Sequence, residues 1–182
     1  MPQVQVRPAA SADLPVLTAL DHSYSPEYVW QMETRPGEAG GDSIGVAFRQ
    51  VRLPRSVRVN PPRDPQALTE AWNRRVCFLV AEEGGHLQGY LNLSVANVPG
   101  TAWIADLGVE RRFRRAGVGS VLLAAALQWG RAHDLQRVIL ETQSKNYPAI
   151  SFAQKHGLVF CGYNDRYYPN QDVALFFGAA LK

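Results

Sequence analysis

Residues 104–120 read Ile-Ala-Asp-Leu-Gly-Val-Glu-Arg-Arg-Phe-Arg-Arg-Ala-Gly-Val-Gly-Ser, an apolar strand followed by a basic turn and a helix that opens on glycines. The first turn of a helix carries unpaired N–H donors and the positive end of the helix dipole, which together bind phosphate. Gly117 and Gly119 let the backbone bend and let its N–H groups approach a ligand. The stretch therefore predicts a phosphate-binding loop, to which two arginines add charge, formed by Arg114, Arg115, Ala116, Gly117, Val118, Gly119 and Ser120.

The spacing of these glycines excludes two common nucleotide-binding motifs. It is neither the Gly-x-x-x-x-Gly-Lys-Ser/Thr pattern of P-loop proteins nor the Gly-x-Gly-x-x-Gly fingerprint of dinucleotide-binding proteins. On spacing alone, a glycine-rich turn before an ordinary core helix is the alternative, so the flanking sequence has to decide.

Hydrophobic periodicity and turn residues predict strands and helices on both sides of the loop. After it, they predict a helix over 117–133, a strand over 137–142, a helix over 148–156 ended by Gly157, and strands over 158–163 and 173–177. Before it, Gly84-Gly85 joins strands over 77–81 and 87–95, and a third strand covers 101–109. The N-terminal part predicts a strand at Val4–Val6, helices from Ser11 and over 24–32, strands within 45–59 and a helix over 64–74. This order indicates a mixed α/β sheet.

The loop and the segments after it resemble the GNAT superfamily of N-acetyltransferases. The resemblance rests on Arg-x-x-Gly-x-Gly from Arg114 after the strand at 106–109, then on Leu-Glu-Thr-Gln at 140–143, Asn-Tyr-Pro-Ala at 146–149 and Lys-His-Gly-Leu at 155–158. It covers residues 78–177 and, within the superfamily, is most similar to the streptothricin acetyltransferases over 104–177. It implies a mixed, mostly antiparallel sheet of about seven strands with about four flanking helices.

The resemblance also implies acetyl-CoA as the co-substrate. In this family the loop amides hold the pyrophosphate, and the preceding strand, here Leu107, Gly108 and Val109, bonds the pantetheine through its backbone. The asparagine at position 146 commonly contacts the cofactor. The implied reaction is direct attack of a primary amine on the thioester, with a backbone N–H near Val109 polarising the carbonyl.

The attacking amine has to lose a proton, so a base is expected nearby. Glu141 is the first candidate, because relatives place a carboxylate on this strand. Asp106 is the second, because a carboxylate inside an apolar strand is unusual. For each, a solvent-facing or ion-paired strand residue is the alternative.

The expected general acid is missing. Family members often carry a tyrosine at the position of Ala153. Solvent or another tyrosine would have to protonate the thiolate, and the candidates are Tyr147, Tyr163, Tyr167 and Tyr168. Because of this departure, a non-catalytic coenzyme A-binding module is an alternative to an active enzyme.

The acceptor is the least determined part. We expect a small-molecule amine, and a streptothricin-type antibiotic and a protein or peptide amine are the alternatives. Residues 48–63 contain no acidic residue but five arginines, Arg49, Arg52, Arg55, Arg58 and Arg63. This stretch fits either a solvated edge strand or a basic wall that attracts an acidic substrate or the 3′-phosphate of coenzyme A. Its positive charge argues against a polycationic acceptor. Because no stacking aromatics interleave with these arginines, no nucleic-acid partner is expected.

The bulk composition fits one domain over 1–182, with an acceptor-side half at 1–75 and a cofactor-binding half at 76–182. The chain has 46% hydrophobic residues, a net charge of +3 and two cysteines, Cys77 and Cys161, expected to be reduced and buried. No signal peptide, no apolar run of roughly 18 residues and no metal-ligand spacing is present, which predicts a cytoplasmic protein without membrane or metal partners. A homodimer is left open.

Overall fold

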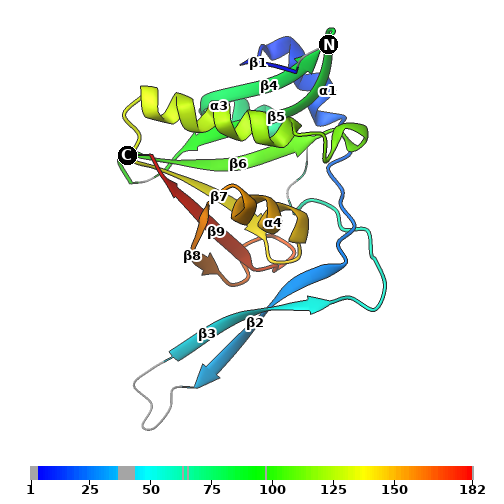
Figure 1. The fold of residues 1–182 in the computed structure, drawn as a ribbon, viewed down its shortest axis with the longest axis vertical. Coiled ribbons are helices and arrows are strands. Elements are labelled where there is room, and N and C mark those ends of the chain that lie inside the picture. The colour runs from blue at the N-terminus through cyan, green and yellow to red at the C-terminus, as the bar shows by residue number, and fades with distance from the viewer. Residues whose placement is uncertain (1–3, 37–43, 63, 65, 97, 182) are drawn as a thin grey trace.

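The computed structural model describes residues 4–36, 44–62, 64, 66–96 and 98–181. A seven-stranded sheet forms its centre (Figure 1), and only β6 and β7 run parallel within it. In spatial order its strands are β1 (Gln5–Pro8), β4 (Arg75–Glu83), β5 (His86–Val95), β6 (Thr101–Val109), β7 (Arg137–Gln143), β9 (Ala174–Ala180) and β8 (Val159–Asn164). The predicted mixed, mostly antiparallel sheet is confirmed.

Helices cover both faces of this sheet. The longest, α3 (Val118–Ala132), crosses β4, β5 and β6, while α4 (Tyr147–Lys155) packs beside β7 (Figure 1). The opposite face of β4 and β5 packs against α1 (Leu14–Thr18) and α2 (Ala67–Arg74). Two single turns of 3-10 helix, Ser11–Asp13 and Arg111–Phe113, precede α1 and α3.

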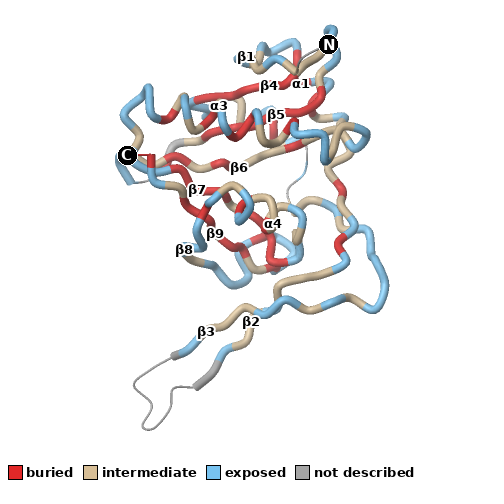
Figure 2. The backbone as a smooth tube through the Cα atoms, viewed as in Figure 1, coloured by how far each residue is buried: buried red, intermediate tan, exposed pale blue. Residues whose placement is uncertain are grey.

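The apolar run of β4 is continuous because the strand is covered on both faces. Cys77, Leu79 and Ala81 belong to the core beneath α3, whereas Phe78 and Val80 belong to the core beneath α1 and α2. Figure 2 shows this burial as red segments through the centre of the sheet and along α3. Burying both faces of the central strands supplies the main stabilisation of the domain.

The glycine turns form as predicted. Gly84 and Gly85, with φ of 58° and 80°, join β4 to β5, as a type I′ hairpin requires. Gly157, with φ of 76°, follows α4 at the position where a left-handed residue ends a helix.

The parallel pair β6–β7 separates after half its length. The ladder joins 101–104 to 137–140 and then stops. Beyond that point β6 keeps pairing with β5 as far as Val109, and β7 keeps pairing with β9 as far as Gln143. A bulge in β6, where Asn92 pairs with Asp106 and Leu93 with Ile104, lies at the point of separation. The strand ends therefore have no ladder between them.

A second sheet, the hairpin of β2 (Tyr28–Pro36) and β3 (Ile44–Arg52), extends away from the body (Figure 1). The predicted helix over 24–32 was therefore wrong. Val29 and Trp30 favour strands, and pairing with β3 fixes them in one. The hairpin is held to the body by the bond from the N–H of Trp30 to the carbonyl of Ser144, at 2.9 Å, and by the contact of Phe48 with Tyr163.

The two cysteines differ. Both are free, but Cys77 is buried and Cys161 is exposed. The prediction of two buried thiols was wrong for Cys161, because β8 is an edge strand with most of its residues open to solvent. None of the described helices is long and apolar enough to cross a membrane.

Candidate active site

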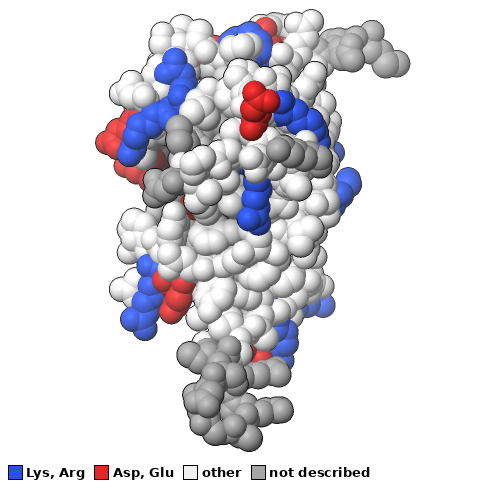
Figure 3. Space-filling model, turned by 90° about the vertical axis from the view of Figure 1, so that its left-hand side faces the viewer, with Lys and Arg blue, Asp and Glu red and all other residues white. Residues whose placement is uncertain are grey.

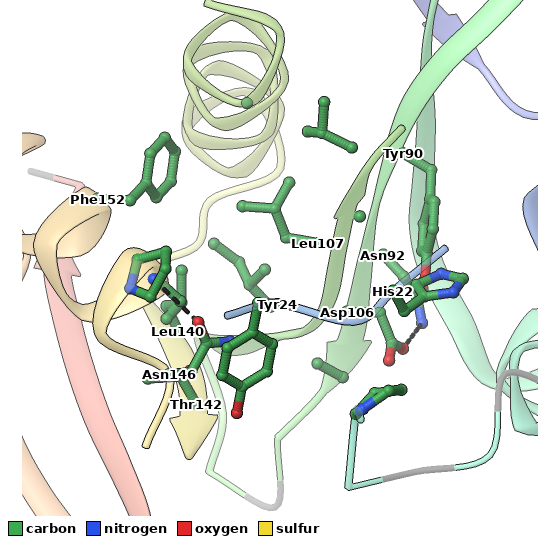
Figure 4. A pocket seen from close by; sticks show the side chains of 18 of the residues that line it. His22, Tyr24, Tyr90, Asn92, Asp106, Leu107, Leu140, Thr142, Asn146 and Phe152 are labelled. Atoms are coloured by element: carbon green, nitrogen blue, oxygen red, sulfur yellow. Dashed lines mark hydrogen bonds between the residues drawn. The ribbon is translucent and has the colours of Figure 1, made fainter. Parts of the chain in front are cut away.

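A cavity of about 1260 Å³ lies where β6 and β7 separate. Its walls come from β5, β6, β7, the start of α3, one face of α4 and the segment before β2 (Figure 4). It brings together both predicted carboxylates and most of the predicted cofactor residues: Asp106, Glu141, Leu107, Gly108, Val109, Arg114, Arg115, Gly117, Gly119, Ser120 and Asn146. Ala116 and Val118 do not line it, and the side chain of Val118 packs into the core.

The start of α3, where the sequence predicts phosphate binding, lies at the cavity and has no side-chain cap. Gly117 is the N-cap residue, with φ of 90°, and no side chain caps the helix. A Cβ built on Gly117 would meet nothing within 4 Å, so the space beside this residue is open. Arg115 also has a positive φ, of 68°, and such backbone turns form concave nests of N–H groups that bind anions.

Two other predicted cofactor glycines serve packing. A Cβ on Gly119 would lie 3.3 Å from the ring of Phe152 on α4, so this glycine lets α3 and α4 approach each other. A Cβ on Gly108 would lie 2.5 Å from Cε1 of Tyr90, which leaves no room for any side chain. Gly108 therefore allows the buried ring of Tyr90 to cross β6.

Arg114 is bound to backbone carbonyls. Its Nε donates to the carbonyl of Val109 at 2.9 Å, one Nη donates to that of Ser23 at 2.7 Å, and the other donates to that of Asp21. The guanidinium thus joins the end of β6 to the segment before β2, 91 residues away from Ser23 in sequence. Arg115 is exposed at the mouth of the cavity and is the member of the pair placed beside the start of α3.

The segment that Arg114 holds forms a wall of the cavity. Asp21 accepts bonds from the Ser23 hydroxyl at 2.6 Å, the Ser23 N–H at 3.0 Å and Arg58 at 3.2 Å. The bonds from Ser23 lower the pKa of Asp21 to about 2, and the charges of Arg58 and Arg114 act in the same direction. Sequence reasoning missed this segment, because nothing in its local pattern marks it as part of a site.

His22 lies in the same wall and was also missed. Its Nε2 is 2.9 Å from the hydroxyl of Tyr90, and burial lowers the pKa of its imidazole below the usual value (Figure 4). Burial also raises the pKa of the Tyr90 hydroxyl, so both rings are neutral at physiological pH.

The two candidate bases stand on opposite walls. Asp106 follows the bulge in β6 and accepts a bond from Nδ2 of the buried Asn92 at 3.3 Å (Figure 4). Glu141 lies on β7 and accepts a bond from the hydroxyl of Tyr167 at 3.1 Å. Both carboxylates can accept a proton or an N–H bond from a molecule in the cavity.

The tyrosines proposed to replace the missing acid separate into two groups. Tyr168 lines the cavity, and Tyr167 reaches it through Glu141. Tyr147 packs against Tyr28, and Tyr163 packs against Phe48 on the hairpin, so neither belongs to the described lining. Ala153 is fully buried in the core.

Near the start of α3, the structure adds polar groups that the sequence did not single out. His156, which the sequence did not place in the site, has its Nε2 3.0 Å from the hydroxyl of Ser120, and both line the cavity with Lys155. Asn146 caps α4, with its Oδ1 accepting from the N–H of Ala149 at 3.2 Å. The basic side chains of this end therefore lie beside the open N–H groups of α3.

The arginine-rich stretch lies elsewhere. Arg49 pairs with Glu33 on the hairpin at 2.8 Å, Arg58 holds the Asp21 segment, and no arginine of residues 49–58 lines the cavity. Arg63 lies outside the described residues. On the one face of the molecule that Figure 3 draws, basic groups are separated by acidic and neutral ones, without a continuous basic stripe. Among the described residues, no three His, Cys, Asp or Glu side chains cluster as metal ligands.

Comparison with known proteins identifies a family model that matches the chain and solved structures that share its fold. The acetyltransferase (GNAT) family model matches residues 47–158. Streptothricin acetyltransferase A of Bacillus subtilis (strain 168) is 31% identical over 86 residues, which cover 45% of this chain and 50% of that relative. The chain thus matches half the length of this curated relative.

Two solved structures share the fold over almost the whole chain. Nourseothricin acetyltransferase has a TM-score of 0.81 and 23% identity, with 98% of this chain and 99% of that chain covered. A protein assigned as a streptothricin acetyltransferase from Bacillus anthracis str. Ames, in complex with acetyl coenzyme A, has a TM-score of 0.75 and 22% identity, with 98% and 97% covered.

Proposed function

The chain belongs to the acetyltransferase (GNAT) family, and from this we propose that it is an acetyl-CoA-dependent N-acetyltransferase acting on a primary amine of a small molecule. The observation that carries the proposal is the open, uncapped start of α3 at Gly117, next to the gap between β6 and β7. One cavity connects this anion site with two carboxylates.

The residues present fit acetyl-CoA. The N–H groups that begin α3 at Gly117, Val118 and Gly119 would hold the diphosphate, with Arg115, Ser120 and Asn146 around it. Where the ladder to β7 ends, alternate backbone groups of Leu107, Gly108 and Val109 face the gap and would bind the amides of an extended pantetheine arm. When bound, acetyl-CoA supplies an activated acyl thioester.

The chain's own residues would manage the proton and the charge. Glu141 is proposed as the base that takes the proton of the attacking amine, directly or through water, with Asp106 as the alternative. A backbone N–H near Val109 would stabilise the negative charge that develops on the carbonyl oxygen. Tyr168 or solvent would return a proton to the leaving thiolate.

A streptothricin-type antibiotic is the second candidate acceptor. Of the arginines that argued against a polycationic acceptor, Arg49, Arg52, Arg55 and Arg58 lie outside the described cavity lining, whereas Asp106 and Glu141 lie in it. The match to streptothricin acetyltransferase A of B. subtilis supports the same acceptor. A peptide N-terminus and a non-catalytic coenzyme A-binding module are the remaining alternatives.

A thiol-release assay with acetyl-CoA tests the proposal. The panel holds three amines, namely streptothricin, spermidine and a short peptide with a free N-terminal alanine. We expect release above background hydrolysis with streptothricin or spermidine, and an acetylated product by mass spectrometry. Turnover of the peptide alone would contradict the small-molecule acceptor, and binding of acetyl-CoA without turnover of any amine would support the non-catalytic module.

A further inference from the structure

A chain of four polar side chains leads to the wall of the cavity, which Tyr24 and Gln143 line. Lys145 forms an ion pair with Oδ1 of Asp172. Oδ2 of Asp172 accepts a bond from Nε2 of Gln143 at 2.7 Å, and Oε1 of Gln143 accepts a bond from the hydroxyl of Tyr24 at 2.7 Å. Gln143 is only 2% exposed and Asp172 only 8% exposed, so both are held away from solvent.

The direction of each hydrogen bond follows from this order. Asp172, paired with an ammonium, is a carboxylate and can only accept. Gln143 must therefore turn its NH₂ group toward Asp172, because the opposite orientation would bring two acceptor oxygens together. Its carbonyl then faces Tyr24, and the single proton of the Tyr24 hydroxyl has to be donated to it.

Tyr24 thus presents no donor to the cavity that it lines. Burial, with the charge of Asp172, raises the pKa of its hydroxyl, so the group stays protonated through the neutral pH range. With the proton committed to Gln143, the remaining lone pairs of Oη can only accept. A group of this kind binds an N–H and gives nothing to a carbonyl or a carboxylate.

The N–H that binds to Tyr24 could belong to the acyl acceptor or to the pantetheine arm of acetyl-CoA, and the position of Tyr24 distinguishes between them. In Figure 4, Leu107 and Leu140 lie between α3 and the side chains of Tyr24 and Asp106. Tyr24 and Asp106 are therefore on the far side of these leucines from the proposed anion site at the start of α3. An acyl acceptor has to reach the thioester from this side, whereas the pantetheine amides lie between the thioester and the diphosphate.

We propose that Tyr24 binds the acceptor amine through its phenol oxygen, which Gln143 and Asp172 force to act as a hydrogen-bond acceptor, across the cavity from Asp106. Tyr24 is then a substrate-binding residue, and Gln143 and Asp172 are positioning residues that act through it. The arrangement selects acceptors that arrive with N–H groups, such as ammonium, over acids and carbonyl compounds. This inference rests on the proposed function.

Three variants test it: Tyr24→Phe, Gln143→Met and the double variant. Tyr24→Phe keeps the ring and removes the oxygen, and Gln143→Met keeps the volume and frees the hydroxyl of Tyr24 to rotate. Tyr163→Phe, on the exposed strand β8 outside the cavity lining, is the matched control. For each, KM and kcat are measured with the three amines of the panel, and the Kd of acetyl-CoA is measured by calorimetry.

We expect Tyr24→Phe to raise the KM of the amine about tenfold, the loss of one hydrogen bond to a charged donor, with the Kd of acetyl-CoA unchanged. Gln143→Met should change KM in the same direction, and the double variant should be no worse than Tyr24→Phe, because Gln143 acts through Tyr24. If Tyr24→Phe does not fold, Gln143→Met alone carries the comparison, since it leaves the phenol in place.

Two results would overturn the inference. An unchanged amine KM in an active Tyr24→Phe protein, or a weaker Kd for acetyl-CoA at constant amine KM, would remove Tyr24 from the acceptor site. The proposed function fails separately, in the wild type, if none of the three amines is acetylated, and the inference then fails with it.

Discussion

The guanidinium of Arg114 donates a hydrogen bond to the backbone carbonyl of Ser23 at 2.7 Å and so ties the loop before α3 to the wall of the cavity. The same group bonds the carbonyl of Val109, at the end of β6. One side chain therefore fixes the distance between the strand that would hold the thioester and the segment that carries His22 and Tyr24. We therefore expect different roles for the two adjacent arginines, a structural one for Arg114 and a cofactor-binding one for Arg115.

Replacing Arg114 with Gln should lower the free energy of unfolding by about 2 kcal/mol, because three carbonyls lose a charged donor. It should raise the KM of the amine more than the Kd of acetyl-CoA. Arg115→Gln, at an exposed position, should do the reverse, with an unchanged fold and acetyl-CoA binding weakened about fivefold by the loss of one charge near phosphate. Urea denaturation and calorimetry on both variants check this, and equal effects on acetyl-CoA would contradict it.

Gly108→Ala should destabilise the protein by about 1 to 3 kcal/mol, the usual effect of overpacking a filled interior. The new Cβ would lie 2.5 Å from Cε1 of Tyr90, so the buried ring would have to shift, which would disturb its contact with His22. Gly162→Ala, with 3.5 Å of clearance to the ring of Phe176, is the control and should change stability little. Comparable denaturation midpoints for the two variants would contradict this account of Gly108.

The free energy of unfolding should fall as the pH drops below about 6.5. Burial holds the pKa of His22 below that of an unfolded histidine, although the charges of Asp106 and Asp21 oppose this. Between the two values the unfolded chain binds more protons, so stability is fully present above about 6.5 and is lost toward the lower folded value. Denaturation between pH 5 and pH 8 should show a flatter dependence in His22→Gln than in the wild type or in the exposed variant His86→Gln. A slope unchanged by His22→Gln would count against a neutral, buried His22.

Glu141→Gln should lower kcat at neutral pH by about 100-fold or more, as expected for loss of a general base, while acetyl-CoA still binds. Asp106→Asn should act mainly on the KM of the amine. Steady-state kinetics with both substrates varied separate these effects. A large loss of kcat in Asp106→Asn with a small loss in Glu141→Gln would exchange the two roles.

Residues 76–182 were predictable because their signals are local. Gly157 ends α4 as expected, and the helix and strand bounds after Gly117 agree with the structure within one or two residues, except that β9 continues three residues further, to Ala180. The residue pattern around the loop was also enough to identify the resemblance to the GNAT family. These features depend on neighbours in sequence, which is what periodicity and turn chemistry report.

Residues 1–75 were less predictable, because many of their contacts join segments that are far apart in the sequence. Residues 24–32 were expected to be helical, yet pairing with 44–52 makes the segment around Trp30 a strand. His22 meets Tyr90, and Tyr24 meets Gln143, only after the sheet has formed. For the same reason Arg114 was placed beside phosphate by its motif, while the folded chain gives it three carbonyls.

We propose that the open start of α3 at Gly117 binds the diphosphate of acetyl-CoA. Calorimetric titration of acetyl-CoA into the wild type, Gly117→Ala and Gly117→Glu tests it most directly, since both variants share the strain of a side chain at φ of 90° and only one adds a negative charge. We expect binding by the wild type, modest weakening in Gly117→Ala and loss of binding in Gly117→Glu, with all three folded by circular dichroism. No binding by the wild type, or equal affinities for the two variants, would contradict the claim.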